Sequence, residues 1–259
     1  MKILITGYKG FIGRNMVDVL RPNHTLYGYE WGEELPQVEE VDLVMHLGAI
    51  SATTETDVEK VMNQNYDFSC WLLSECQKHG KHFQFSSSAS IYGLGEEFKE
   101  DSPPKPASPY AWSKYLFERY VKKGEGTWTI PVQGFRYFNV HGPQEGHKGD
   151  QASPYYKFTQ QAKETGVIKL FENSDQYKRD FVPVSYVVDI HQQFFDVKES
   201  GIWNIGLGKA KSFQEVAEEV AAEHDARIEY IPMPENIAKQ YQKYTCADLT
   251  KLNRTLVGE

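Results

Sequence analysis

Short apolar runs alternate along the chain with longer segments whose apolar residues recur every three or four positions. The apolar runs are typical of buried parallel strands, which we predict at residues 2–6, 25–29, 41–47, 83–86, 132–135 and 202–205. The segments between them are typical of amphipathic helices, which we predict at residues 11–20, 57–79, 110–123, 185–195 and 213–223. Strands that alternate with helices predict an α/β fold with a parallel sheet and right-handed crossovers.

Composition narrows the class of protein. The chain has 259 residues, of which 40% are hydrophobic and 14% aromatic. A chain of this size buries roughly three-quarters of its unfolded surface, so we expect one domain with a small lobe and little disorder. The formal net charge of −8 argues against a nucleic-acid partner, because proteins that bind phosphate backbones carry an excess of lysine and arginine.

Location and metal content are also constrained. No apolar run approaches the ~20 residues of a membrane span, so no membrane partner is expected. The first residues lead directly into a strand, and no signal peptide is expected. The three cysteines are odd in number and form no CxxC pair, which favours a cytoplasmic location. No metal site is predicted, because His79 and His82 have no evident third ligand.

A glycine-rich loop follows the first strand. Gly7, Gly10 and Gly13 stand between that strand and the first helix, with the spacing of a dinucleotide-binding loop. Glycines let the backbone approach a pyrophosphate, and the helix N-terminus supplies free N–H groups and partial positive charge. A tight turn without a ligand is the alternative interpretation.

The choice between NAD and NADP stays open. Glu30 ends the second strand, 17 residues after Gly13, where an acid accepts hydrogen bonds from an adenosine ribose and favours NAD. No lysine or arginine occurs in residues 22–59, which argues against a pocket for a 2′-phosphate there. Lys9 lies in the glycine loop itself and is able to reach such a phosphate.

A serine, a tyrosine and a lysine form the candidate catalytic group. Tyr110 and Lys114 are four residues apart, so they lie on one helix face. A lysine ammonium beside a phenol is expected to lower the pKa of the phenol and make it a proton shuttle near neutral pH. Ser88 follows the fourth strand and is placed to hydrogen-bond the reacting oxygen.

Together these motifs resemble the extended short-chain dehydrogenase/reductases, Rossmann-like enzymes that act on nucleotide sugars. The matching segments are TGYKGFIG at 6–13, HLGA at 46–49, FSSSASIYG at 85–93, SPYAWSK at 108–114 and FRYFNVHGP at 135–143. The resemblance implies a doubly wound parallel sheet with a small C-terminal substrate-binding lobe. We assign residues 1–140, with 181–205 returning, to the dinucleotide-binding domain, and 141–180 and 206–259 to the lobe.

Five further segments resemble the ADP-L-glycero-D-manno-heptose 6-epimerases of lipopolysaccharide synthesis. They are EGHKG at 145–149, which is the most diagnostic, SATTE at 51–55, KLFENS at 169–174, KRDFV at 178–182 and YQKYTCADLTKL at 241–252. This resemblance implies an NAD(P)-dependent epimerase of a nucleotide-diphosphate sugar, acting at C6 of the heptose through a transient ketone. It favours NADP, and it implies a homo-oligomer.

The resemblance also implies residue roles. Tyr110 and Lys148 would exchange protons on the two faces of the ketone, Ser88 would hold its oxygen, and Lys114 would bind the nicotinamide ribose. Besides Gly7, Gly10, Gly13, Lys9 and Glu30, the cofactor positions are Phe11, Ile12, Trp31, Leu47, Gly48, Ala49, Ser51, Gln64, Lys114 and Val140. The substrate positions are Asn139, Asp150, Lys157, Phe171, Glu172, Asn173, Ser174, Arg179 and Tyr241.

The chain departs from this family at several points. Gln64 stands where an asparagine is usual, Asp150 where a serine is usual, and Lys157 where a histidine is usual. The resemblance implies a strand–helix unit after the second strand and a C-terminal helix, and we expect this chain to lack both. These departures leave two alternatives open: an epimerase or reductase of another nucleotide sugar, and a non-catalytic nucleotide-binding protein.

Overall fold

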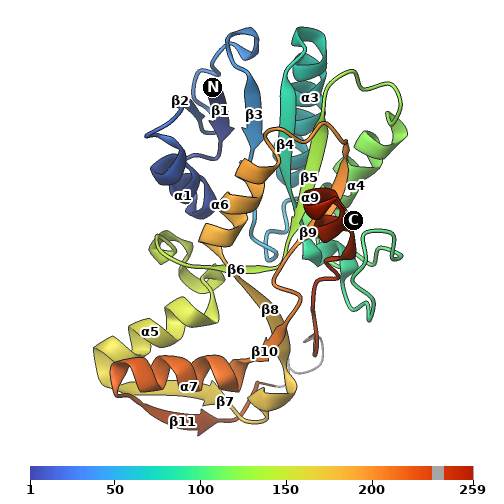
Figure 1. Ribbon diagram of the computed structural model, residues 1–259. Helices are drawn as coiled ribbons and strands as arrows, with labels where there is room; N and C mark the ends of the chain where they lie inside the picture. Colours follow the sequence, from blue (N-terminus) through green and yellow to red (C-terminus); the bar gives the residue numbers. More distant parts are fainter. Residues whose placement is uncertain (235–241, 259) are drawn as a thin grey trace.

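The computed structural model describes residues 1–234 and 242–258. Its larger part is a six-stranded sheet in the order β2-β1-β3-β4-β5-β9, and every neighbouring pair in it is parallel (Figure 1). The strands are β1 (Lys2–Thr6), β2 (Thr25–Tyr29), β3 (Leu43–His46), β4 (His82–Ser88), β5 (Val132–Tyr137) and β9 (Gly201–Ile205). All six predicted strands are confirmed, with ends that differ by up to two residues, and so is the Rossmann-like α/β fold.

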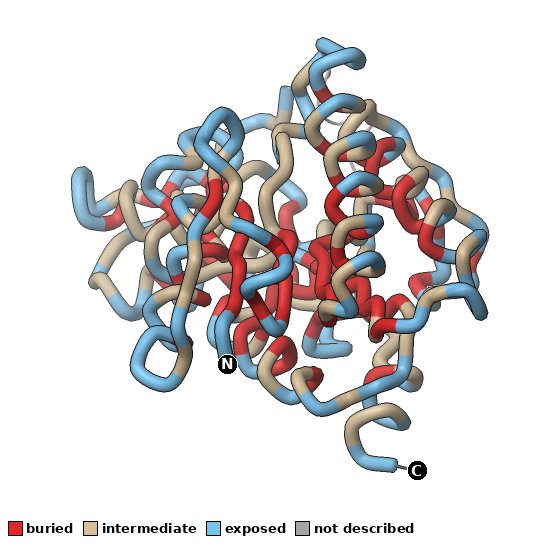
Figure 2. The backbone as a smooth tube through the Cα atoms, turned by 90° about the horizontal axis from the view of Figure 1, so that it is seen from above, coloured by how far each residue is buried: buried red, intermediate tan, exposed pale blue. Residues whose placement is uncertain are grey.

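Helices cover both faces of this sheet. On one face α1 (Phe11–Leu20) contacts α6 (Val184–Gln193), and α9 (Thr250–Val257) packs beside β9. The other face carries α3 (Phe68–His79) and α4 (Pro109–Lys123). Buried residues gather along the strands and the inward sides of these helices, as Figure 2 shows. Two apolar cores, one on each face, therefore hold the sheet in place.

A smaller lobe lies beyond the carboxyl ends of the main strands (Figure 1). Its strands are β6 (Asn139–His141), β8 (Lys178–Pro183) and β10 (Ala210–Ser212) in one sheet, and β7 (Val167–Phe171) paired in parallel with β11 (Arg227–Ile231). Two helices, α5 (Pro154–Thr165) and α7 (Phe213–His224), share an apolar core with the β7–β11 pair. A capping box formed by Ser212 and Glu215 starts α7.

We expected two elements to be missing, a C-terminal helix and a strand–helix unit after β2. We expected the chain to lack a C-terminal helix, and this is wrong, because α9 is present and buries Leu252 against the core that contains Trp203. Between β2 and β3 the chain forms one 3-10 turn, Val38–Glu40, and no strand, so β2 is the edge of the sheet. Whether relatives hold a further unit there stays a prediction.

The helix predicted at 57–79 is divided in the structure. It begins as α2 (Val58–Met62), continues through a π-helical turn at Asn63–Asp67, and resumes as α3, which ends at Gly80. The π turn adds one residue to a helical turn and redirects the side chains on that face. Asn65 lies in this turn and is buried.

A buried polar chain crosses the main sheet. The Tyr137 hydroxyl lies 2.6 Å from Nε2 of His191, and Nδ1 of His191 lies 2.8 Å from Oε1 of Gln84. The Gln84 amide donates to Oε1 of Gln133, so its own oxygen must accept from His191. This network assigns His191 as neutral, protonated at Nδ1, with Tyr137 donating to Nε2. Burial agrees, since it lowers the pKa of His191 to about 3.

We predict that this protein loses stability in mild acid. Burial lowers the pKa of both His46 and His191 from 6.5 to about 3, so only the unfolded chain takes up these protons between those values. Stability therefore falls as pH drops below 6.5, by about 4 kcal/mol for the pair at pH 5. Urea unfolding at pH 7 and pH 5 measures the loss. His191→Gln should halve it and exposed His147→Gln should leave it unchanged; an equal loss in all three proteins would contradict the assignment.

Candidate active site

The glycine loop is built for close contact between backbones. Gly7 has a φ of 72°, and a Cβ added to it would lie 2.6 Å from the backbone of Gly48. A Cβ on Gly13 would lie 2.1 Å from the carbonyl oxygen of Gly7. Gly10 is the N-cap of α1 and has no side chain to occupy the first N–H groups of the helix. The loop therefore fits a pyrophosphate, whose oxygens accept from such groups.

A cavity of about 240 Å³ joins this loop to three of the four predicted catalytic residues, Tyr110, Lys114 and Lys148, whereas Ser88 does not line it. It is lined by Gly7, Gly10, Phe11, Ile12, Gly13, Glu30, Leu47, Gly48, Ala49, Ser51, Ser86, Ser87, Tyr110, Lys114, Tyr137, His147 and Lys148. These residues come from the carboxyl ends of β1, β3, β4 and β5, from α4 and from the 3-10 turn at Gly146–Gln151. Ligands of open α/β sheets bind at this edge.

A second cavity of about 110 Å³ continues from the first. Its walls are Thr6, Gly7, Tyr29, Glu30, Trp31, Gly48, Ala49, Ile50, Gln64 and Phe68. The Trp31 indole meets the Phe68 ring edge-on at 5.5 Å, which gives this cavity an aromatic side suited to a flat base. The two cavities share Gly7, Glu30, Gly48 and Ala49. They therefore form one continuous path, as the extended shape of a dinucleotide requires.

Tyr110 stands in the first turn of α4. Ser108 caps this helix by accepting from the N–H of Ala111, and Pro109 occupies its first position. Burial raises the pKa of Tyr110, while a hydrogen bond with the side chain of Ser88 acts in the opposite direction. Our expectation that Lys114 lowers the pKa of this phenol is therefore not met in the structure.

Lys114 is turned towards strand β4. Its Nζ donates to the carbonyl oxygen of Ser86 at 2.8 Å and to the Ser86 hydroxyl at 3.2 Å, and it lies 6.0 Å from the Tyr110 ring centre. Burial lowers the pKa of Lys114 to about 8, against the attraction of Glu118. Lys114 is thus held at the floor of the cavity, one helical turn below Tyr110.

Lys148 reaches the same cavity from the other side. Its Nζ lies 4.9 Å from the ring centre of Phe11 and 3.8 Å from Oε2 of Glu145. Burial lowers the pKa of Lys148, and the nearby Glu145 carboxylate opposes this. The side chain is 24% exposed, so the ammonium group still reaches the opening.

Glu145 anchors the loop that carries Lys148. Its fully buried carboxylate accepts from the N–H of Gly142 at 3.0 Å, from the N–H of Ser153 at 2.7 Å and from the Ser153 hydroxyl at 2.8 Å. These bonds tie both ends of the loop to one point. Lys148 is consequently placed by fixed structure and not by a free surface loop.

A buried ion pair supports strand β4 from below. Arg136 on β5 donates to Glu118 on α4 through Nε at 2.8 Å and Nη2 at 2.6 Å, and Ser87 donates to the same carboxylate at 2.6 Å. Bidentate pairs of this kind fix geometry as well as charge. They join α4, β4 and β5 immediately beneath Tyr110 and Ser88.

Sequence reasoning did not single out several residues of the site, among them Asn65, Tyr137 and His147. The Asn65 amide accepts from the N–H of Ile50 at 2.8 Å, and it donates to the Ile50 carbonyl and to the Ser113 hydroxyl. It thereby fixes the wall after β3. Tyr137 and His147 line the catalytic cavity. For Asn65 the available signal was its place beside Gln64, but the π turn that buries it has no clear sequence pattern.

The predicted substrate residues lie mainly on the small lobe. Phe171–Ser174 forms the turn after β7, with Ser174 donating to the Phe171 carbonyl at 2.5 Å. Arg179 on β8 is buried and donates to the Lys178 carbonyl. Lys157 donates to the Asp150 carbonyl at 2.7 Å. Asn139 is exposed on β6, and Val140 packs against the main core. Tyr241 lies outside the described residues.

None of these described substrate residues lines the two cavities at the glycine loop. Lys9 is also absent from both walls, although it lies in the loop itself. The other predicted cofactor positions, apart from Val140, do line one cavity or the other.

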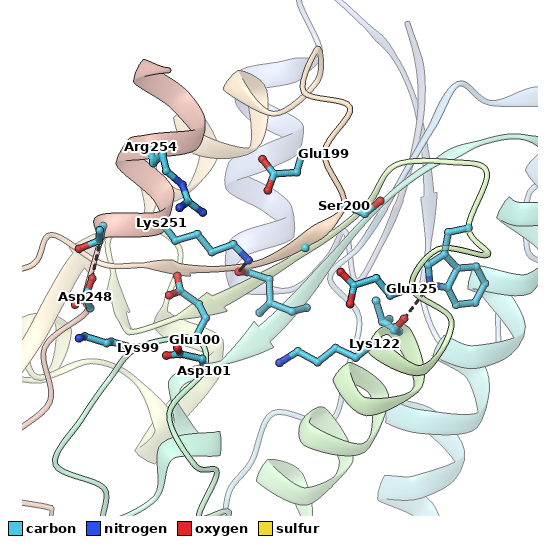
Figure 3. A pocket seen from close by; sticks show the side chains of 15 residues that line it. Lys99, Glu100, Asp101, Lys122, Glu125, Glu199, Ser200, Asp248, Lys251 and Arg254 are labelled. Carbon is cyan, nitrogen blue, oxygen red and sulfur yellow. Dashed lines mark hydrogen bonds between the residues drawn. The ribbon is translucent and has the colours of Figure 1, made fainter. Parts of the chain in front are cut away.

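A separate cavity of about 550 Å³ lies at the opposite end of the sheet, between the end of α4, the start of β9 and α9. Charged side chains of both signs point into it, among them Lys122, Glu125 and Lys251 (Figure 3). Lys251 donates to the carbonyl of Ile202 at 2.8 Å. This cavity is not lined by the glycine loop, so dinucleotide binding is assigned to the other edge.

In the part of the chain that the structure describes, two negative findings apply. No helix has the length and apolar character needed to cross a membrane. No cluster of three or more histidine, cysteine or acidic side chains forms a candidate metal site.

Comparison with known proteins identifies the family. The statistical model of the NAD dependent epimerase/dehydratase family matches residues 3–206. The chain belongs to this family. The predicted resemblance to the extended short-chain dehydrogenase/reductases is confirmed by this match. Membership of the NAD dependent epimerase/dehydratase family also supports a nicotinamide cofactor and a nucleotide-sugar enzyme, without resolving NAD from NADP.

Several solved structures share this epimerase fold. ADP-L-glycero-D-manno-heptose-6-epimerase of Helicobacter pylori is 24% identical with a TM-score of 0.88, covering 99% of this chain and 90% of that one. UDP-N-acetylglucosamine 4-epimerase of Methanobrevibacter ruminantium is 23% identical with a TM-score of 0.87, covering 98% and 91%. UDP-glucose 4-epimerase of Thermus thermophilus, solved with NAD, is 26% identical with a TM-score of 0.80, covering 97% and 92%.

Proposed function

We propose that the protein is an NAD(P)-dependent epimerase of a nucleotide-diphosphate sugar, and that it inverts C6 of ADP-glycero-manno-heptose through a transient ketone. The observation that carries this proposal is the shared cavity in which Tyr110 and Lys148 approach from different elements beside the glycine loop. An epimerase of this type needs two proton-exchanging groups, one for each face of the ketone.

Each residue of the site has a separate role in the proposed reaction. A nicotinamide dinucleotide held by the glycine loop and Lys114 would supply reversible hydride exchange at the carbinol carbon. As the hydride leaves, Tyr110 as phenolate accepts the hydroxyl proton, and Ser88 donates a hydrogen bond to the oxygen that becomes the carbonyl. The ketone then rotates in the site, so that its opposite face points to the cofactor. Lys148 donates the proton to the alkoxide oxygen as the hydride returns. The sum is inversion without net oxidation.

The pKa direction of Lys148 supports its role, whereas burial raises the pKa of Tyr110 and so opposes its phenolate form before substrate binds. Burial lowers the pKa of Lys148, which makes its ammonium a better proton donor. Burial lowers the pKa of Lys114 to about 8, and its ammonium next to the bound substrate would favour the Tyr110 phenolate once water is excluded. The Glu145 anchor holds the loop that carries Lys148 beside the cavity that Tyr110 also lines.

A second candidate is an epimerase of a different nucleotide sugar. Asp150 and Lys157, two positions at which the chain departs from the heptose enzymes, are joined by the hydrogen bond from Lys157 Nζ to the Asp150 carbonyl. The acceptor is the backbone oxygen of residue 150, so this bond depends on the lysine at 157 and not on the aspartate at 150. The two departures at predicted substrate positions motivate a different sugar with unchanged chemistry. UDP sugars are the first compounds to compare, since two of the similar structures are named for them.

Incubation with three sugars tests both candidates. We expect proton NMR to show ADP-D-glycero-D-manno-heptose converting to a mixture of C6 epimers, with no net change in the reduced dinucleotide. UDP-glucose and UDP-N-acetylglucosamine serve as comparisons, and conversion of either one alone would support the second candidate. Consumption of NADH in step with turnover would identify a reductase. Binding without any turnover would contradict both candidates and support the non-catalytic alternative.

A further inference from the structure

Glu30 lies where the two cavities of the site meet. One cavity continues to the glycine loop and the start of α1, and the other continues to Trp31 and Phe68. A dinucleotide with its pyrophosphate on the loop and its adenine against the aromatic side would place its adenosine ribose between them, facing Glu30. The 2′ position of that ribose is the point where NAD and NADP differ.

Glu33 closes a turn over this position. The N–H of Glu33 donates to the carbonyl of Glu30 at 3.0 Å, and the N–H of Glu30 donates to Oε2 of Glu33 at 3.0 Å. The other oxygen of Glu33, Oε1, accepts from Nζ of Lys9 at 2.5 Å. One carboxylate thus holds both the end of β2 and the lysine of the glycine loop.

Lys9 is engaged at its backbone as well as at its ammonium group. Its N–H donates to Oε1 of Glu30 at 2.6 Å, and its carbonyl accepts from Nε of Arg14 at 2.6 Å. The hydrogen bond with Glu33 raises the pKa of Lys9, and the same bond lowers the pKa of Glu33, so both groups are ionised at neutral pH. The ammonium group of Lys9 is therefore already paired with the Glu33 carboxylate.

The surrounding charge adds to this effect. Residues 22–59 contain no lysine or arginine, whereas Glu30, Glu33 and Glu34 follow one another at the end of β2. A 2′-phosphate placed beside Glu30 would meet two carboxylates, Glu30 and Glu33, and like charges brought together cost free energy. A ribose hydroxyl at the same place would donate to Glu30 instead.

We propose that Glu33 sets the cofactor selectivity of this enzyme for NAD over NADP, by holding Lys9 in an ion pair and by repelling a 2′-phosphate. This inference rests on the proposed function, because it assumes a dinucleotide on the glycine loop. It makes Lys9 a latent phosphate ligand: without Glu33, the ammonium group is free to pair with the phosphate of NADP.

Binding of the reduced dinucleotides tests the assignment. NADH and NADPH are titrated into wild type, Glu33→Gln, Lys9→Met, the double variant and Glu34→Gln, at low salt where exposed charges are least screened. Wild type should bind NADH more tightly than NADPH. Glu33→Gln should strengthen NADPH binding about tenfold and change NADH binding less than about twofold. The Lys9→Met substitution should remove this gain in the Glu33→Gln background.

Glu34→Gln is the matched control. It removes the same charge at the next residue, and the Glu34 side chain has no described bond to Lys9. An unchanged NADH to NADPH ratio in Glu33→Gln would overturn the assignment, and so would an equal change in Glu34→Gln. If neither dinucleotide binds wild type, the proposed cofactor site itself fails. If NADH binds and the ratio stays fixed, only the role of Glu33 fails.

Discussion

Tyr110→Phe is expected to lower kcat by about 10²- to 10⁴-fold while cofactor affinity changes little. The substitution removes one hydroxyl, which is the group proposed to take the proton of the reacting alcohol, and general acid–base catalysis contributes this order of magnitude. The ring itself remains to fill the cavity wall formed with Lys114 and Tyr137. Steady-state turnover of the preferred nucleotide sugar, together with titration of NADH, separates the two effects.

Tyr115→Phe is the control for this experiment. Tyr115 lies on the same helix, but its hydroxyl contacts Arg119 and does not line the catalytic cavity. We expect Tyr115→Phe to turn over at the wild-type rate, and Lys148→Ala to resemble Tyr110→Phe, because each half-reaction needs its own proton exchange. Wild-type activity in both Tyr110→Phe and Lys148→Ala would refute the assigned roles.

Lys114→Met is expected to stabilise the protein and to inactivate it. Lys114 is buried apart from its contact with the cavity, and burial lowers its pKa from 10.5 to about 8, so keeping it charged at pH 7 costs free energy of folding. Replacing it by an apolar chain of similar length removes this cost and the two bonds to Ser86. The expected net gain is about 1 to 3 kcal/mol in the free energy of unfolding at pH 7.

The stability difference between Lys114→Met and wild type is expected to depend on pH. Between pH 8 and pH 10.5 the unfolded wild type binds the Lys114 proton and the folded wild type does not, so wild-type stability rises with pH. The advantage of Lys114→Met should therefore shrink as pH rises through this range. Urea unfolding at pH 7 and pH 9.5 measures both values, with exposed Lys123→Met as the control. A destabilised Lys114→Met at pH 7 would contradict the buried-charge account.

The main sheet was predictable because each of its strands contains a short apolar stretch, such as Ile3–Ile5, and most are followed by a segment of helical period. The strands of the small lobe were not predicted. β11 (Arg227–Ile231) alternates apolar and polar residues over only five positions, and β10 (Ala210–Ser212) has three residues. Such short strands form because their partners β7 and β8 are adjacent in space, which periodicity along the chain does not report.

The candidate site was predictable where chemistry needs a fixed spacing. The glycine loop and the Tyr110–Lys114 pair have that property, and both line the cavity. The pKa of Tyr110 was not predictable, because its direction depends on burial and on where Lys114 Nζ turns. Asn65, which fixes the wall after β3, depends on a π turn that no sequence pattern reveals. Contacts formed between distant segments, such as Glu33 with Lys9, require the folded chain.

Transfer of a label tests the central claim most directly. ADP-D-glycero-D-manno-heptose carrying deuterium at C6 is incubated with the enzyme in ordinary water, and the epimeric product is examined by NMR and mass spectrometry. The account predicts that the inverted product keeps its deuterium at C6, because the hydrogen leaves as a hydride and returns to the same carbon while Tyr110 and Lys148 exchange only oxygen-bound protons. Inversion with loss of the deuterium to water would contradict it.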